Sequence, residues 1–243
     1  MQEMIISEKL NYLIADKQFY EPLSRYAARR QDLHEPLLRI LPEGWRLGQR
    51  NLWSDCTPPD LELPAQGWKI HLSATPAHAP AILITVARIL IAKGVSFKFI
   101  SDRMLMMMVN GKRWNRGGAG KFITVYPKDQ AQCGELLEEL HQATIGYWGP
   151  YILSDRRYKD SRVVHYRYGG IMPIRRAGVD GKAVMVIQDG EGGYIDDERT
   201  PYFRLPNGIE DPFQSPEAAL SDQGEAGVLK NGRYKIESVL GFS

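Results

Sequence analysis

The sequence has little of several features that would assign it to a class at once. Of its 243 residues only two are cysteine, Cys56 and Cys133, and no CxxC pair occurs. Neither a disulfide framework nor a cysteine-rich zinc site is therefore supported. No stretch approaches the roughly twenty apolar residues of a membrane helix. The first residues also lack the basic-then-apolar plan of a signal peptide. These absences predict a cytoplasmic protein.

A strong excess of charge is also missing. Lysine and arginine number 31 against 29 aspartate and glutamate residues, a net charge of +2, so a general affinity for nucleic acid does not follow. The five histidines show no ligand cluster, and no metal site is expected. The glycine-rich stretch from Arg113 to Lys121 fails the P-loop pattern, because Lys121 leads into a strand and no Gly-x-x-x-x-Gly-Lys-Ser/Thr frame fits. We interpret it as a mobile basic loop that can close over an anion.

What the sequence does have is a strand pattern with positive charge on one face. Within residues 67–74, apolar side chains alternate with Lys69, His71 and Ser73. This is the period of a strand with one buried face, so Lys69 and His71 project together from the other face. Taken alone, such a lysine and histidine would be ordinary surface residues.

The same arrangement recurs at three further places. Lys98 alternates with apolar residues in 95–99, Lys121 opens the stretch 121–126, and Arg167 lies opposite Val164 and Tyr166 in 163–168. If these strands pair into one sheet, they build a positively charged face whose self-repulsion a bound anion would relieve. A phosphate group is the leading candidate.

Other parts of the chain have helical patterns. We expect helices over residues 1–40, from Thr75-Pro76 to Gly94, over 102–109, and from Asp129 onward. In the second of these, the buried stripe should be Ile82, Leu83, Val86, Ile89 and Leu90. The 243 residues are enough for one large domain or for one domain plus an appendage.

The connecting segments are expected to be irregular. An extended segment runs between Trp45 and Trp53, whose rings should pack in the core or seat a lid. Residues 56–60 should form a turn. Gly169-Gly170 should end the strand that carries Arg167. From about residue 206 the composition is that of a linker.

Several ordered motifs resemble one known family. They are Gly-Trp-Lys-Ile-His at 67–71, Gly-Lys-Phe-Ile-Thr-Val-Tyr-Pro at 120–127, Gly-Pro-Tyr at 149–151, Ser-Asp-Arg-Arg at 154–157 and Tyr-Arg-Tyr-Gly at 166–169. Together they resemble the N-terminal lyase domain of class III lanthipeptide synthetases, which join a phosphoserine/phosphothreonine lyase to kinase-like and cyclase-like domains. The domain is more distantly similar to the phosphothreonine lyase effectors of pathogenic bacteria.

The resemblance has consequences for fold and organisation. It implies an α+β phosphothreonine-lyase-like domain over residues 1–205, with a mostly antiparallel sheet flanked by helices. A linker over 206–228 and the first strand of a truncated kinase-like domain over 229–243 would follow. The substrate would be a precursor peptide bearing phosphoserine or phosphothreonine, with covalently linked kinase and cyclase domains as partners and neither nucleic acid nor membrane involved. No cofactor is implied for the lyase step, since ATP and Mg would belong to the kinase domain.

The resemblance also implies a set of site residues. His71 matches the general acid, Lys98 the base and Lys69 the lysine that accompanies the acid. Asp155 matches a supporting carboxylate. The residues matched to phosphate binding are Arg116, Lys121, Tyr126, Arg156, Arg167 and Arg175. Arg157 and Arg176 stay open as alternatives, because adjacent residues of an extended chain cannot both face one pocket.

These residue types suit the elimination of phosphate from phosphoserine. The α-proton is weakly acidic, so a base must be held within about 3 Å of it. Neighbouring cations and partial burial favour the neutral form of Lys98, and a phosphate dianion favours the charged form of His71. The alternative is a phosphopeptide- or leader-binding module that positions substrate for a kinase without catalysis. A third reading is a lyase that acts on folded phosphoproteins.

Overall fold

The computed structural model describes residues 33–50, 52–112, 114–172, 174–177, 183–197 and 200–214, and the backbone of 228–229 and 234–235. The expected helix over 1–40 lies mostly outside these residues, which include only its end as α2 (His34–Leu38). Most of the expected kinase-like strand over 229–243 also lies outside them. Of that region the structure describes β11 (Val228–Leu229) paired with β12 (Tyr234–Lys235).

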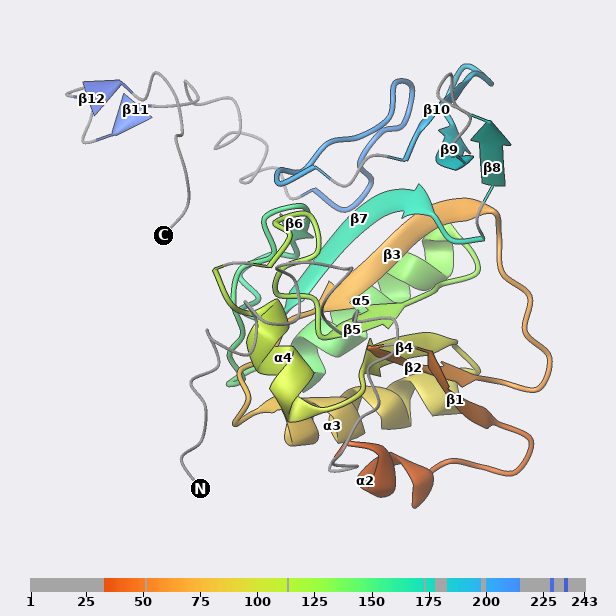
Figure 1. Cartoon of the computed structure of the whole chain (residues 1–243), viewed down its shortest axis with the longest axis vertical. Coiled ribbons are helices and arrows are strands. Elements are labelled where there is room, and N and C mark those ends of the chain that lie inside the picture. Colours follow the sequence, from red (N-terminus) through yellow and green to blue (C-terminus); the bar gives the residue numbers. More distant parts are fainter. Residues whose placement is uncertain are drawn as a thin grey trace, which may run out of the picture.

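A seven-stranded sheet forms the centre of the protein (Figure 1). Its strands lie in the order β1-β2-β4-β5-β3-β7-β6, and every pairing among the described strands is antiparallel. Their bounds are β1 Arg46–Arg50, β2 Trp53–Thr57, β3 Gln66–Leu72, β4 Phe97–Ile100, β5 Ile123–Val125, β6 Arg156–Arg157 and β7 Val164–Gly170. A second, three-stranded sheet comprises β8 (Ile174–Ala177), β9 (Ala183–Gln188) and β10 (Tyr194–Asp196). The predicted α+β fold with a mostly antiparallel sheet is confirmed.

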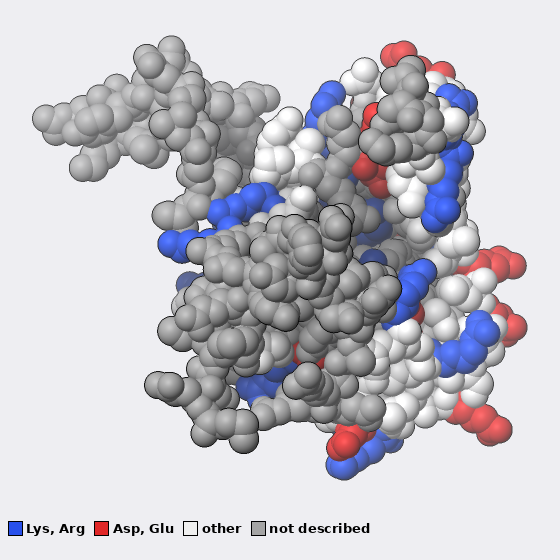
Figure 2. Space-filling view, in the orientation of Figure 1, with Lys and Arg blue, Asp and Glu red and all other residues white. Residues whose placement is uncertain are grey.

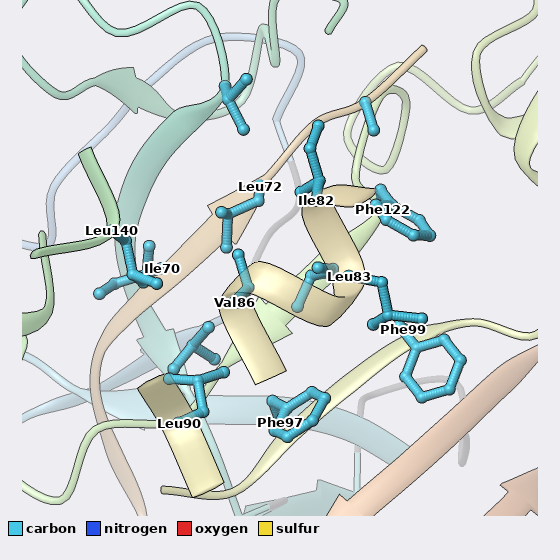
Figure 3. Close-up of a cluster of buried hydrophobic side chains, with 14 of the residues drawn as sticks. Ile70, Leu72, Ile82, Leu83, Val86, Leu90, Phe97, Phe99, Phe122 and Leu140 are labelled. Atoms are coloured by element: carbon cyan, nitrogen blue, oxygen red, sulfur yellow. The ribbon is translucent and has the colours of Figure 1, made fainter. Parts of the chain in front are cut away.

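One face of the large sheet is the hydrophobic core. The register sets Phe97, Val125, Ile70 and Tyr166 side by side across β4, β5, β3 and β7. Two helices cover this face, α3 (Ala79–Ala92) and α5 (Gln130–Ala143). Figure 3 shows the resulting cluster, in which helical side chains pack on Ile70, Leu72, Phe97 and Phe99. Because strand side chains alternate, residues one position along the strands must face away from this core.

The helices begin and end largely where the sequence predicts. Asp102 caps α4 (Arg103–Val109) by accepting from the Leu105 N–H at 2.8 Å, and Asp129 caps α5 in the same way at Gln132. Gly94 follows α3 with a φ of +64°, a conformation that glycine adopts without strain. The start of α3 differs from the prediction. Thr75 opens a preceding turn by accepting from the His78 N–H, and the helix begins at Ala79 with Pro80 in its first turn.

The structure corrects three of the expected connections. β1 and β2 pair as antiparallel neighbours, so Cys56 lies within a strand that ends at Thr57 instead of opening a turn. The pair Gly169-Gly170 completes β7 instead of breaking it, because both glycines pair with β3. The linker does not begin at residue 206. Asp211 accepts hydrogen bonds from Arg156 and from the Tyr166 hydroxyl, and Phe213 packs edge-on against Trp68 at 5.2 Å.

Among the described residues, no helix is long and apolar enough to cross a membrane. Cys56 and Cys133 are both buried and free of any disulfide. On the face that Figure 2 shows, the described Lys and Arg side chains are interspersed with Asp and Glu along the right-hand edge.

Candidate active site

Polar side chains gather on the face of the large sheet that points away from the core. Lys98 of β4 pairs with Thr124 of β5, Thr124 pairs with His71 of β3, and His71 pairs with His165 of β7. Directly paired residues share a face, and neighbouring strands lie about 4.8 Å apart, so the backbones of Lys98 and His71 are separated by about 10 Å. Lys69 and Arg167 form the next row of the same face. The predicted cationic face is thus present.

A buried network holds His71. Asp155, in the loop before β6, accepts a hydrogen bond from His71 Nδ1 through one carboxylate oxygen. Its other oxygen lies 2.9 Å from Lys121 Nζ and accepts from Ser154 Oγ at 2.7 Å. The four side chains are almost wholly excluded from solvent. The structure therefore joins three residues, His71, Lys121 and Asp155, that lie more than thirty positions apart in the chain.

The charges in this network follow from burial and from the neighbours. Burial alone would raise the pKa of Asp155, but His71 and Lys121 outweigh it and hold that pKa well below its usual range. Burial lowers the pKa of His71 to about 3, against the opposing effect of Asp155. In the free protein Asp155 is therefore ionised, Lys121 is its counter-charge, and His71 is neutral and donates its Nδ1 proton to Asp155. Nε2 is then the nitrogen through which His71 can exchange a proton with substrate.

This network changes the interpretation of the glycine-rich stretch. Lys121 is buried beside Asp155, not carried on a loop that closes over an anion. Gly120 turns the chain into this position with a φ of +77°, and a Cβ there would already touch Ile152 and Pro150 at 3.4 Å. Arg116 is half-buried in the turn that precedes it. Its match to a phosphate-binding arginine stays a prediction.

Lys98 lies between two aromatic rings. Its Nζ is 4.5 Å from the ring centroid of Trp53 and 5.8 Å from that of Tyr126, and Asp55 of β2 is its partner in the register. These cation–π contacts hold the ε-amino group close to the sheet. Tyr126 was predicted to belong to the site. Trp53 was expected to pack in the core or to seat a lid, although its alternation with Ser54 and Asp55 is a strand signal that could have placed it here.

Arg167 and Lys69 form a second cationic group. Arg167 is 8% exposed, and its guanidinium lies 3.4 Å from Asp197. Lys69 Nζ donates to the Gly170 carbonyl at 2.7 Å. Beside them an open cavity of about 340 Å³ reaches the surface. Its lining includes Arg167, Asp197, Ile187, Ile195, Arg204 and Leu205.

Two predicted phosphate ligands are not brought to this face. In β6, Arg156 pairs with Tyr166 and therefore points to the core side, where it binds Asp211 at 2.7 Å and stacks on Phe203. Arg157 pairs with His165 and is the arginine on the site's face. Arg175 is exposed on β8, in the small sheet. Arg175 pairs with Met185 and so lies on the face of the small sheet that carries Ile187 and Ile195, two residues of the cavity lining. Arg176 lies on the other face, where it stacks on Tyr194.

His165 is a site neighbour that the sequence interpretation did not single out. It lies beside His71 in the register, and burial lowers its pKa to about 4. Its Nδ1 contacts the Val163 carbonyl at 3.1 Å, and Tyr151 packs edge-on against its ring at 5.2 Å. With a neutral imidazole in these contacts, His165 helps to hold β7 in place beside the strand that carries His71. Within the described ranges, no three His, Cys, Asp or Glu side chains come together in a way that could hold a metal ion.

Comparison with known proteins adds a family. Residues 34–225 match the protein family described as RamC, N-terminal domain. The chain is 37% identical over 236 residues to a probable SapB synthase of Streptomyces coelicolor. That alignment covers 96% of this chain and 25% of the relative, so the chain spans about a quarter of the length of the curated relative it matches.

Solved structures with a similar fold are bacterial effector proteins. The type III effector/phosphothreonine lyase OspF of Shigella flexneri is 16% identical with a TM-score of 0.42, over 66% of this chain and 88% of OspF. The Salmonella phosphothreonine lyase SpvC gives 16% identity and a TM-score of 0.42, over 67% and 88%. An effector of Pseudomonas syringae gives 16% identity and a TM-score of 0.45, over 74% and 77%.

Proposed function

We propose that this chain, which belongs to the family of RamC N-terminal domains, is a lyase that eliminates phosphate from phosphoserine or phosphothreonine in a lanthipeptide precursor. The products would be dehydroalanine or dehydrobutyrine and inorganic phosphate. The precursor as substrate is supported by the likeness to a probable SapB synthase. Kinase and cyclase domains linked to the lyase, the kinase supplying the phosphorylated residue with ATP and Mg, are part of the same proposal.

The observation that carries this proposal is the shared row of Lys98 and His71. Elimination needs one group to remove the α-proton and another to protonate the departing oxygen. Lys98 of β4 and His71 of β3 lie on the same face and in the same row, with Thr124 of β5 between them. A phosphorylated residue seated between them could present its α-carbon to one and its phosphate ester to the other.

The proton transfers balance with these two groups alone. Lys98, as the neutral amine, takes the α-proton, and the released electron pair forms the Cα=Cβ double bond. The bond from Cβ to the ester oxygen breaks, and its electron pair leaves with the phosphate. The departing oxygen takes a proton from His71 Nε2. Since His71 is neutral in the free protein, the bound phosphate dianion must first raise its pKa so that Nε2 becomes protonated.

The cations around the row would bind the phosphate. Lys69 and Arg167 lie in the neighbouring row of the face, and strand geometry puts Lys69 about 7 Å from His71. A guanidinium can hold two phosphate oxygens at once and offset the charge that develops as the bond breaks. Arg116 and Tyr126 would complete the site, and Arg157 would replace Arg156 in it. Arg175 could reach it only from the small sheet.

The direct test is incubation with a synthetic phosphoserine peptide. With a chelator present and ATP absent, the peptide should lose the mass of phosphoric acid, and free phosphate should appear in equal amount. Lys98→Ala should abolish both signals. Lys93→Ala is the matched control, because Lys93 is a lysine at the end of α3 in the helix layer, paired with Glu139, and its loss should leave the rate unchanged. A peptide that binds but stays intact with the unaltered protein would contradict the proposal and favour a phosphopeptide-binding module.

A further inference from the structure

The carboxylate of Asp197 lies among the groups best suited to bind phosphate. It follows β10 in the small sheet and is held there by a hydrogen bond from its own N–H to the Met185 carbonyl. One of its oxygens faces the guanidinium of Arg167 at 3.4 Å, and the other accepts from the Gly170 N–H at 3.3 Å. The negatively charged carboxylate of Asp197 thus already lies at the second cationic group of the site, which consists of Arg167 and Lys69.

Two glycines make room for this carboxylate. A Cβ added at Gly169 would lie 3.0 Å from one Asp197 oxygen and 3.1 Å from Lys69 Nζ. A Cβ at Gly170 would lie 3.2 Å from the other Asp197 oxygen. Because neither residue has a side chain, the end of β7 leaves a hollow bounded by a guanidinium, an ammonium group and a backbone N–H. These are the donors that bind phosphate in proteins.

Asp197 fills the hollow loosely. Both of its contacts are longer than the about 2.7–2.9 Å of well-formed charge-assisted hydrogen bonds. The pair with Arg167 is nevertheless withdrawn from solvent, the two side chains being 10% and 14% exposed. The hollow opens into the cavity of about 340 Å³ that both side chains line. A phosphate with more charge and a third oxygen could enter from there and form shorter bonds.

We propose that Asp197 is an internal competitor that occupies the phosphate subsite until the phosphorylated residue of the substrate displaces it. The subsite consists of Arg167, Lys69 and the Gly170 N–H. This inference rests on the proposed function, since it names the position of the phosphate in that same site. Because every incoming anion must first displace the Asp197 carboxylate, the apparent affinity of the subsite for all anions is lowered by one common factor. Weakly bound anions are thereby excluded, whereas a substrate peptide has further contacts that offset the loss.

Binding of inorganic phosphate to Asp197→Asn and Asp196→Asn tests the proposal. Asp196 lines the same cavity and carries the same charge, but it is exposed. Asp196→Asn therefore controls for the general loss of negative charge. We expect Asp197→Asn to bind phosphate at least roughly tenfold more tightly than the unaltered protein, the factor that corresponds to one lost charge-assisted hydrogen bond. Asp196→Asn should stay within about twofold. Equal changes in the two variants, or weaker binding by Asp197→Asn, would overturn the proposal.

A second measurement does not require a variant. In the unaltered protein, titration with phosphate should shift the NMR signals of the Gly170 amide and of the Asp197 side-chain carboxyl together, since the two groups separate as the anion enters. Saturable phosphate binding that leaves both signals in place would contradict the inference. Neither measurement depends on turnover. If phosphate displaces Asp197 but a phosphoserine peptide stays intact, this inference holds and the proposed function is wrong. If the peptide releases phosphate but Asp197 is not displaced, the proposed function holds and this inference is wrong.

Discussion

At the scale of single residues, the site depends on one buried carboxylate. Asp155 accepts from His71 and Ser154 and lies 2.9 Å from Lys121 Nζ, and it has almost no exposure of its own. It orients His71 and fixes which of its nitrogens carries the proton. The same contacts make it a structural centre, because Lys121 would otherwise be a buried charge without this partner.

Asp155→Asn should therefore affect both stability and turnover. Removal of one member of a buried ion pair leaves the other charge uncompensated, and this typically destabilises a protein by about 3–5 kcal/mol. We expect a loss of that size in urea unfolding. The rate of phosphate release should also fall, because an amide does not hold His71 in one tautomer as a carboxylate does.

A double variant separates the two effects. In Asp155→Asn/Lys121→Met the buried positive charge that faced Asp155 is gone, so much of the lost stability should return while the rate stays low. If the double variant is as unstable as the sum of the two single variants, the electrostatic account of this network is wrong.

At the scale of secondary structure, β6 decides which arginine belongs to the site. Arg156 and Arg157 are neighbours in the chain but pair with Tyr166 and His165, which lie on opposite faces of the sheet. Arg156 ties the segment around Asp211 to the core. Arg157 is on the face of His71. A two-residue strand thus separates a structural role from a candidate binding role.

Alanine substitution at each position makes a matched pair. Arg156→Ala should lower the free energy of unfolding, by up to about 3 kcal/mol, with little change in KM for a phosphopeptide. Arg157→Ala should raise KM and leave stability almost unchanged. The urea midpoint and the KM of both variants check this assignment, and the reverse pattern would mean that the arginine on the core side reaches substrate.

Strand faces and the starts of two helices are the features of the fold that the sequence predicted best. Alternation along 67–74, 95–99 and 163–168 predicted which side chains share a face, because a strand has a period of two. The register confirms it for Lys69, His71 and Lys98. The helices expected over 102–109 and from Asp129 onward also begin where they were predicted, at the capping residues Asp102 and Asp129.

Features that arise from tertiary contacts could not be predicted in this way. Asp155 and Asp197 reach the sheet from loops whose paths no periodicity encodes. The segment over 206–213 has the composition of a linker, yet Asp211 and Phe213 bind it to the core. Lys121 has the sequence of a mobile loop residue, and only the buried carboxylate opposite it reveals its environment. Motif resemblance correctly identified the family, but by itself it matched Arg156 where the strand face favours Arg157.

At the scale of the whole molecule, the buried histidines link stability to pH. Both His71 and His165 have pKa values lowered by burial, to about 3 and about 4, from the ordinary 6.5. Between about pH 6.5 and pH 4 the unfolded chain therefore binds protons that the folded protein does not. Stability must fall as the pH falls through this window.

Urea unfolding between pH 7 and pH 4.5 measures the effect. Each histidine contributes a slope of up to about 1.4 kcal/mol per pH unit below its unfolded pKa. His165→Asn, which removes one of the two groups and none of the proposed chemistry, should reduce the slope by about one proton. A stability that is constant from pH 7 to pH 5 would mean that these histidines are not held neutral by the fold.

The central claim of this account is that Lys98 and His71 divide the two proton transfers of one elimination. The most direct test compares a phosphoserine peptide with a peptide whose serine bears an activated leaving group that needs no protonation. On the phosphoserine peptide both Lys98→Ala and His71→Ala should be severely impaired, since general acid or base catalysis is worth roughly two to four orders of magnitude. On the activated peptide His71→Ala should recover most of its rate, whereas Lys98→Ala should remain inactive because the α-proton is still in place. Recovery of Lys98→Ala without recovery of His71→Ala would contradict the account.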